Sequence, residues 1–117
     1  MTSQIIRHEP NAIYAKVTEA NGFVFTAGIV ASNLAAGVTG QTEEILGEID
    51  RLLGLCGTDR SRIVSVNIYL VDIRTREEVN AAWKPWTGGH DLPARTTVEA
   101  KLADPRMLVE ISAVAAK

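Results

Sequence analysis

The chain has 117 residues, which suits one compact domain better than two. Hydrophobic residues make up 46% and charged residues 22%, and the formal net charge is -2, which argues against a nucleic-acid binder with a broad basic surface. One Cys and two His exclude an internal disulfide framework and nearly exclude zinc sites made of several Cys or His. Any enzymatic chemistry therefore depends mostly on carboxylates, Arg, hydroxyls and backbone groups.

The sequence shows neither a targeting segment nor a membrane span. The first ten residues, MTSQIIRHEP, lack a basic start followed by a long apolar run, so no secretory signal is expected. No apolar stretch approaches the roughly 20 residues that cross a bilayer. The lone Cys56 fits a reducing cytoplasm. We expect residues 1–117 to form a single cytoplasmic domain that contacts no membrane.

The N-terminal part of the chain predicts three strands. Residues 5–7 suit a short strand, and residues 12–19 suit a second, because apolar and polar side chains roughly alternate there. Asn21-Gly22 is a strong signal for a two-residue hairpin turn. Residues 23–26 are therefore predicted to return as a third strand.

A helix is predicted to begin at about residue 42. Its apolar residues recur at helical spacing: Ile45, Leu46, Ile49, Leu52, Leu53 and Cys56. Glu43 and Glu44 are expected in its first turn, where acidic side chains complement the helix dipole. Either Gly54 or Gly57 can end this helix.

A strand and a second helix are predicted next. Residues 63–71 alternate between apolar and polar side chains, as a half-buried strand does. Thr75 and Glu78 have the spacing of a capping box for a helix over residues 76–87, and Pro85 should distort its last turn. Gly88-Gly89 would then close the helix.

Two final strands are predicted at residues 94–102 and 107–115. The short connection between them favours an antiparallel pair. The element order is then β-β-β-α-β-α-β-β, and the expected architecture is α+β, a sheet with both helices on one face. The other face of the sheet must meet either water or another subunit.

Arg95 and Glu110 are the candidates for chemistry in these last strands. Alternation places Arg95 with Thr97, and Glu110 with Ser112, on the polar faces, which we expect to point away from the helices. A guanidinium donates two parallel hydrogen bonds to a carboxylate, and a Glu can orient and deprotonate a water. The alternative is a solvated sheet face that carries scattered charges.

A family resemblance rests on LPARTTVE at residues 92–99, followed by LVEISAVA at residues 108–115. This pair resembles the C-terminal signature of the YjgF/YER057c/UK114 family, the RidA-like group of reactive-imine deaminases. The likeness covers nearly the whole chain in the family's order, because it extends through residues 25–28 (FTAG), 41–57, 66–70 and 79–83 (VNAAW).

The resemblance implies a chorismate-mutase-like α+β fold that assembles as a homotrimer. The three sheets would face inward around a barrel-like core, with the sites in clefts between subunits. The implied reaction is hydrolysis of a 2-imino or 2-enamino acid, such as 2-iminobutyrate or 2-aminoacrylate, to a 2-keto acid and ammonia. It requires no metal or organic cofactor, because the protonated imine carbon is already electrophilic and needs only a held carboxylate and a placed water.

The resemblance also assigns expected roles to individual residues. Arg95 would bind the substrate carboxylate, and Glu110 would position the water. Four further residues match substrate-binding positions: Tyr14, Gly28, Asn80 and Thr97. Ala27 stands where a Ser is common, and Ile29 follows Gly28 where a Gln is frequent, so we expect a branch of the family with altered substrate preference.

Other aromatic and ionisable residues have simpler interpretations. Trp83 and Trp86 share one helix face and are expected to pack in the protein, although one of them closing over the pocket is an alternative. His8 and His90 are expected at the surface. Two other functions remain open: a metabolite-binding regulatory trimer without turnover, and, disfavoured by the acidic balance, an endoribonuclease or translation inhibitor.

Overall fold

The computed structural model describes residues 4–117, and the first three residues, part of the segment in which we expect no secretory signal, lie outside it. The predicted order β-β-β-α-β-α-β-β is confirmed. The elements are β1 (Ile6–Pro10), β2 (Ala15–Ala20), β3 (Phe23–Thr26), α1 (Val38–Leu55), β4 (Ile63–Leu70), α2 (Arg76–Thr87), β5 (Ala94–Glu99) and β6 (Val109–Ala116), with short 3-10 turns at Arg60–Arg62 and Ile73–Thr75.

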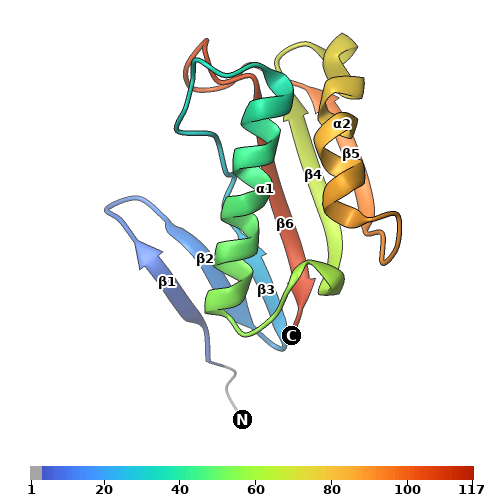
Figure 1. Cartoon of the computed structure of the whole chain (residues 1–117). Helices are drawn as coiled ribbons and strands as arrows, with labels where there is room; N and C mark the ends of the chain where they lie inside the picture. The colour runs from blue at the N-terminus through green and yellow to red at the C-terminus, as the bar shows by residue number, and fades with distance from the viewer. Residues whose placement is uncertain (1–3) are drawn as a thin grey trace.

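The strands form one mixed sheet, and both helices cover the same face of it (Figure 1). Its strand order is β1-β2-β3-β6-β4-β5. The predicted α+β architecture with both helices on one face is therefore confirmed. The core lies between the helices and the sheet, and its fully buried members include Val17, Val24, Ile45, Ile49, Leu52, Leu53, Ile68, Val79 and Ile111. Among residues 4–117, no helix is both long and apolar enough to cross a bilayer.

The predicted antiparallel pairing of the last two strands is wrong. β6 lies between β3 and β4 and is antiparallel to both, whereas β5 is an edge strand that runs parallel to β4. Both strands are also shorter than predicted at their facing ends, so the connection from Glu99 to Val109 is too long for a tight hairpin. β6 takes a central place because every second side chain in it is buried.

The first helix begins earlier than predicted, and this changes the role of its acidic residues. α1 begins at Val38, so Glu43 and Glu44 do not lie in its first turn. The Glu44 carboxylate instead accepts hydrogen bonds from the backbone N–H groups of Ser32 and Asn33, at 2.5 and 3.1 Å. These bonds hold the preceding loop against the helix, and they lower the pKa of Glu44. At the other end, Gly57 follows the helix with a φ of 74°, a conformation that suits glycine.

The predicted capping box of the second helix is also wrong. Thr75 does occupy the N-cap of α2, but its hydroxyl donates to the carbonyl of Asp72 at 2.7 Å and leaves the helix N–H groups uncapped by a side chain. The helix continues past Pro85 to Thr87. Gly88 then adopts a left-handed conformation and closes the helix, as predicted.

The core of α1 provides a stability test with an internal control. Leu52 is fully buried, whereas Leu55, on the same helix, is 47% exposed. Leu52→Ala is expected to lower the free energy of unfolding by about 2–5 kcal/mol, because it removes buried methyl groups and leaves a cavity. Leu55→Ala is expected to cost less than about 1 kcal/mol. Urea denaturation measures both, and equal losses would contradict the core described above.

Candidate functional site

Arg95 lies on the helix-covered side of the sheet, contrary to the prediction that it points away from the helices. The parallel register places it beside Val66, which is buried under the helices. Its guanidinium carbon lies 5.0 Å from the centre of the Trp83 ring on α2, and its Nε donates to the Thr97 hydroxyl at 3.1 Å. The edge position of β5 explains the error, because alternation along an edge strand separates two faces without telling which one meets the helices.

The charge of Arg95 is not neutralised by any carboxylate in the part of the chain that the structure describes. No ion pair joins it to an acidic side chain among residues 4–117, and only its Nε makes a hydrogen bond there. Partial burial lowers the pKa of Arg95, while the nearby charge of Glu77 acts in the opposite direction. The two terminal nitrogens therefore remain available to bind an anion beside the Trp83 ring.

The helix α2 completes this part of the site with side chains three residues apart. Glu77, Asn80 and Trp83 follow one another at helical spacing on the side near β5, and the Asn80 side-chain amide donates to Glu77 at 3.3 Å. We call Asn80, Trp83, Arg95 and Thr97 the Arg95 group. The contact between Trp83 and Arg95 was not predicted, because it depends on how α2 lies over the sheet.

Glu110 points to the open face of the sheet, as predicted. Its strand register pairs it with Tyr69 on β4. The neighbours of Tyr69, Ile68 and Leu70, point to the buried, helix-covered face, so Tyr69 and Glu110 point to the opposite face. Its carboxylate lies against Gly28. A Cβ atom added at Gly28 would come within 2.5 Å of the nearer carboxylate oxygen, so only glycine leaves this space to Glu110.

Tyr14 lies near Gly28 at a separate cavity of about 490 Å³. Both residues line it, together with Lys16, Ile29, Val30, Ala31, Ser32, Glu44, Gly47, Glu48 and Arg51. Three of the charged members are paired with one another: Glu48 accepts from Lys16 at 3.2 Å and from Arg51 at 2.5 Å. We call Gly28 and Glu110, which lie against each other, the Glu110 group. Tyr14 is linked to it only through the cavity that it shares with Gly28.

The structure brings the predicted residues together in two groups rather than one. Arg95 contacts Thr97, and Glu110 contacts Gly28, but Arg95 and Glu110 lie on opposite faces of the same sheet. Each chain thus carries a guanidinium without a carboxylate partner among residues 4–117 on one face of its sheet and the Glu110 carboxylate on the other.

The remaining aromatic, histidine and cysteine residues considered in the sequence analysis differ in how deeply they are buried. Trp83 is buried, and its ring centre lies 5.5 Å from that of the half-buried Trp86. His90 is exposed in a loop, and its Nδ1 lies 3.2 Å from a carboxylate oxygen of Asp91. The expectation that His8 lies in a surface loop is wrong, because His8 is half-buried in β1, where its Nε2 hydrogen-bonds with Glu19. Cys56 is buried as expected, and desolvation there raises its pKa to about 11.

Comparison with known proteins agrees with this architecture. Residues 5–117 match the family model described as Endoribonuclease L-PSP. A RutC family protein of Haemophilus influenzae is 38% identical over 107 residues, covering 91% of this chain and 92% of its own. The RutC family protein YoaB of Escherichia coli K12 is 35% identical over 112 residues, covering 96% of this chain and 97% of its own.

Solved structures agree with the sequence matches. NMB1025 of Neisseria meningitidis, a member of the YjgF protein family, superimposes with a TM-score of 0.92 at 36% identity, covering 97% of this chain and 95% of its own. Rv2704 of Mycobacterium tuberculosis, from the YjgF/YER057c/UK114 family, gives 0.86 at 26% identity, covering 99% and 100%. The fold is therefore that of the YjgF proteins. The chain belongs to the YjgF/RutC family, as the sequence resemblance predicted.

Proposed function

We propose that this protein hydrolyses reactive 2-imino or 2-enamino acids to 2-keto acids and ammonia. The observation that carries the proposal is Arg95, whose guanidinium rests against Trp83 with its two terminal nitrogens free of any carboxylate in residues 4–117. Such a group matches a planar carboxylate, the one feature that all 2-imino and 2-keto acids share. The family relationship supports this class of reaction.

Glu110 is the proposed base for the attacking water. The protonated imine carbon accepts the water oxygen, and Glu110 takes a proton from that water. Glu110 returns this proton to the amine nitrogen of the resulting tetrahedral intermediate. The carbon–nitrogen bond then breaks, the new hydroxyl gives its proton to Glu110 as it becomes the carbonyl of the 2-keto acid, and ammonia leaves. Arg95 and Glu110 supply an anchor and a base, so the reaction needs no metal and no organic cofactor.

Gly28 is a positioning residue in this scheme, and replacing it gives a specific expectation. Gly28→Ala would place a methyl group 2.5 Å from the Glu110 carboxylate, which must then swing away. We expect activity to fall by about 10- to 100-fold, a typical cost of misplacing a reacting group by about 1 Å. The melting temperature should change little, because the displaced atoms are the flexible end of a side chain.

The matched control for that variant is Gly54→Ala. Gly54 lies in α1, and a Cβ there would meet nothing within 4 Å. This control should keep full activity and gain up to about 1 kcal/mol of stability from the better helix propensity of alanine. Full activity in Gly28→Ala would contradict the proposed role of the Glu110 carboxylate.

We further propose that two subunits of a homotrimer complete each site. The Arg95 group and the Glu110 group lie on opposite faces of one sheet, so one chain alone does not join them. The uncovered face of the sheet supports an assembly, because Phe23, Phe25 and Val98 are 42%, 42% and 41% exposed there. Apolar side chains on an uncovered sheet face are typical of a surface that packs against another subunit.

The assembly is tested by placing a charge on that face. Phe25→Glu is expected to yield monomers and to abolish turnover, because a buried unpaired carboxylate at a subunit interface is strongly unfavourable. Leu55→Glu is the control, since Leu55 is 47% exposed on α1, on the helix side of the sheet. Light scattering coupled to gel filtration reports the mass of each variant. A monomeric wild-type protein, or a trimer that survives Phe25→Glu, would contradict the arrangement.

The activity itself is tested by generating the unstable imines in situ, within the assay mixture. An amino-acid oxidase produces a series of 2-imino acids, and the rate of keto-acid release is compared with and without this protein. Ala27 and the buried Ile29 make the surroundings of Gly28 less polar, so we expect larger apolar substrates to be preferred over the imines of polar amino acids. No acceleration with any member of the series would contradict the proposal.

The same less polar surroundings favour a second candidate, a trimer that binds a carboxylate metabolite without turning it over. Calorimetry with 2-keto acids separates the two, because saturable binding without any imine hydrolysis would support this regulatory function. An endoribonuclease activity, which the description of the family model suggests, has less support from the formal net charge of -2.

A further inference from the structure

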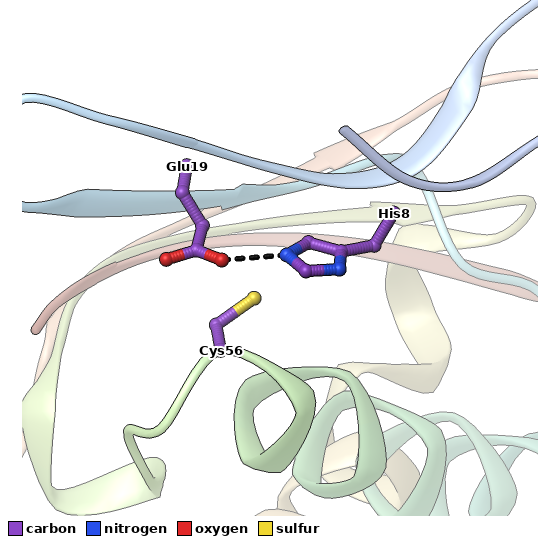
Figure 2. Close-up of side chains that lie close together, drawn as sticks. All are labelled: His8, Glu19 and Cys56. Atoms are coloured by element: carbon purple, nitrogen blue, oxygen red, sulfur yellow. Dashed lines mark hydrogen bonds and ion pairs between the residues drawn. The ribbon is translucent and has the colours of Figure 1, made fainter. Parts of the chain in front are cut away.

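A further cluster, made of three side chains that can bind metals, lies apart from the Arg95 and Glu110 groups. His8 lies in β1, Glu19 lies in β2, and Cys56 is the C-cap residue that follows α1 (Figure 2). His8 Nε2 lies 2.5 Å from a carboxylate oxygen of Glu19. One nitrogen, one oxygen and one sulfur atom of the three side chains all lie within 4.8 Å of one another.

The fold builds this cluster from three separate elements. In the β1–β2 ladder Ile6 pairs with Glu19 and His8 with Val17, so His8 and Glu19 are diagonal neighbours on one face. That face is the helix-covered one, because Val17 is fully buried on it. The end of α1 then brings the Cys56 sulfur toward the pair, as Figure 2 shows.

We propose that His8, Glu19 and Cys56 bind a divalent transition metal of the zinc class. An imidazole nitrogen, a carboxylate oxygen and a thiolate sulfur are three donors that zinc accepts in a four-coordinate site. Glu19 and Cys56 are 7% and 4% exposed, while the His8 side chain is 26% exposed and leaves one side open for entry and for a water as fourth ligand. The thiol releases its proton to solvent on binding, so one carboxylate and one thiolate balance the two charges of the metal.

Lys117 competes with the metal for Glu19. Its ammonium lies 2.5 Å from the second carboxylate oxygen, and its side chain is 42% exposed. Because this side chain lies partly in solvent, the ammonium can turn away from Glu19 when a metal arrives. The competition lowers the affinity of the site, so removing this ammonium should tighten metal binding.

Cobalt is the direct probe of this site. The purified protein is treated with a chelator, freed of it, and titrated with Co²⁺. We expect one Co²⁺ per chain and a sulfur-to-cobalt charge-transfer band in the near ultraviolet, which Zn²⁺ then displaces. The band reports the Cys56 thiolate specifically, since Cys56 is the only cysteine in the sequence.

Three variants and one control decide the outcome. Cys56→Ser should remove the band, His8→Gln should weaken binding by about 10- to 100-fold, and Lys117→Met should strengthen it. His90→Gln, which changes the other histidine, should leave the titration unaltered. Circular dichroism verifies that each variant is folded.

Two results would overturn the proposed metal site. A folded wild-type protein with no charge-transfer band at excess Co²⁺ would overturn the proposal and leave His8, Glu19 and Lys117 as an ion network. Binding that survives both Cys56→Ser and His8→Gln would place the metal elsewhere and overturn it too. Neither result depends on imine hydrolysis, so this proposal and the proposed function stand or fall separately.

Discussion

Replacing Arg95 with Ala is expected to lower kcat/KM for 2-imino acids by about 100- to 1,000-fold. The loss corresponds to about 3–4 kcal/mol, which is the scale of two charge-assisted hydrogen bonds in a partly buried site. The structure gives the reason: among residues 4–117 the guanidinium lies against the Trp83 ring and forms a hydrogen bond only through Nε, to Thr97, which leaves both terminal nitrogens for the substrate. Initial rates of keto-acid release measure the effect.

One further variant, with a control, separates the charge of Arg95 from its shape. Arg95→Lys keeps the positive charge but cannot form two parallel bonds, so it should raise KM more than it lowers kcat. Arg74→Ala is the control, because Arg74 is exposed and pairs with the neighbouring Asp72. Full activity in a correctly folded Arg95→Ala protein would remove the carboxylate anchor from the proposed function.

Glu110→Gln is expected to lower kcat by about 100-fold, while KM changes little. Glutamine has nearly the same size, so it fits the space that Gly28 leaves, but it cannot take a proton from water. Glu43→Gln, an exposed change on α1, is the control and should behave as wild type. Rates that are equal in Glu110→Gln and wild type would show that another group activates the water.

The two variants together test how the site is divided between subunits. If Arg95 of one subunit works with Glu110 of its neighbour, a mixed trimer of Arg95→Ala and Glu110→Gln chains contains one intact site. Unfolding and refolding an equal mixture should then restore about a quarter of the wild-type activity, because about three trimers in four are mixed. No recovery in verified mixed trimers would show that each subunit uses its own Arg95 and Glu110.

Local periodicity was sufficient to predict the helices, the strands and their order. The apolar spacing in α1 and the alternation in β4 are properties of neighbouring residues, and they persist because one side of each element is buried. The same reasoning predicted the burial of Cys56 and the direction of Glu110, since both belong to elements with a clearly apolar face. The family was recognisable because its motifs occur in order along nearly the whole chain.

The tertiary structure decided which elements lie side by side. Strand pairing is a contact between residues far apart in the sequence, so the parallel pairing of β5 with β4, and the resulting position of Arg95 under Trp83, had no local signal. The meeting of His8, Glu19 and Cys56 likewise depends on a strand register and on the point where α1 ends. The sequence by itself determined which residues could do chemistry and which elements carry them. Packing of the helices on one sheet decided which of those residues meet.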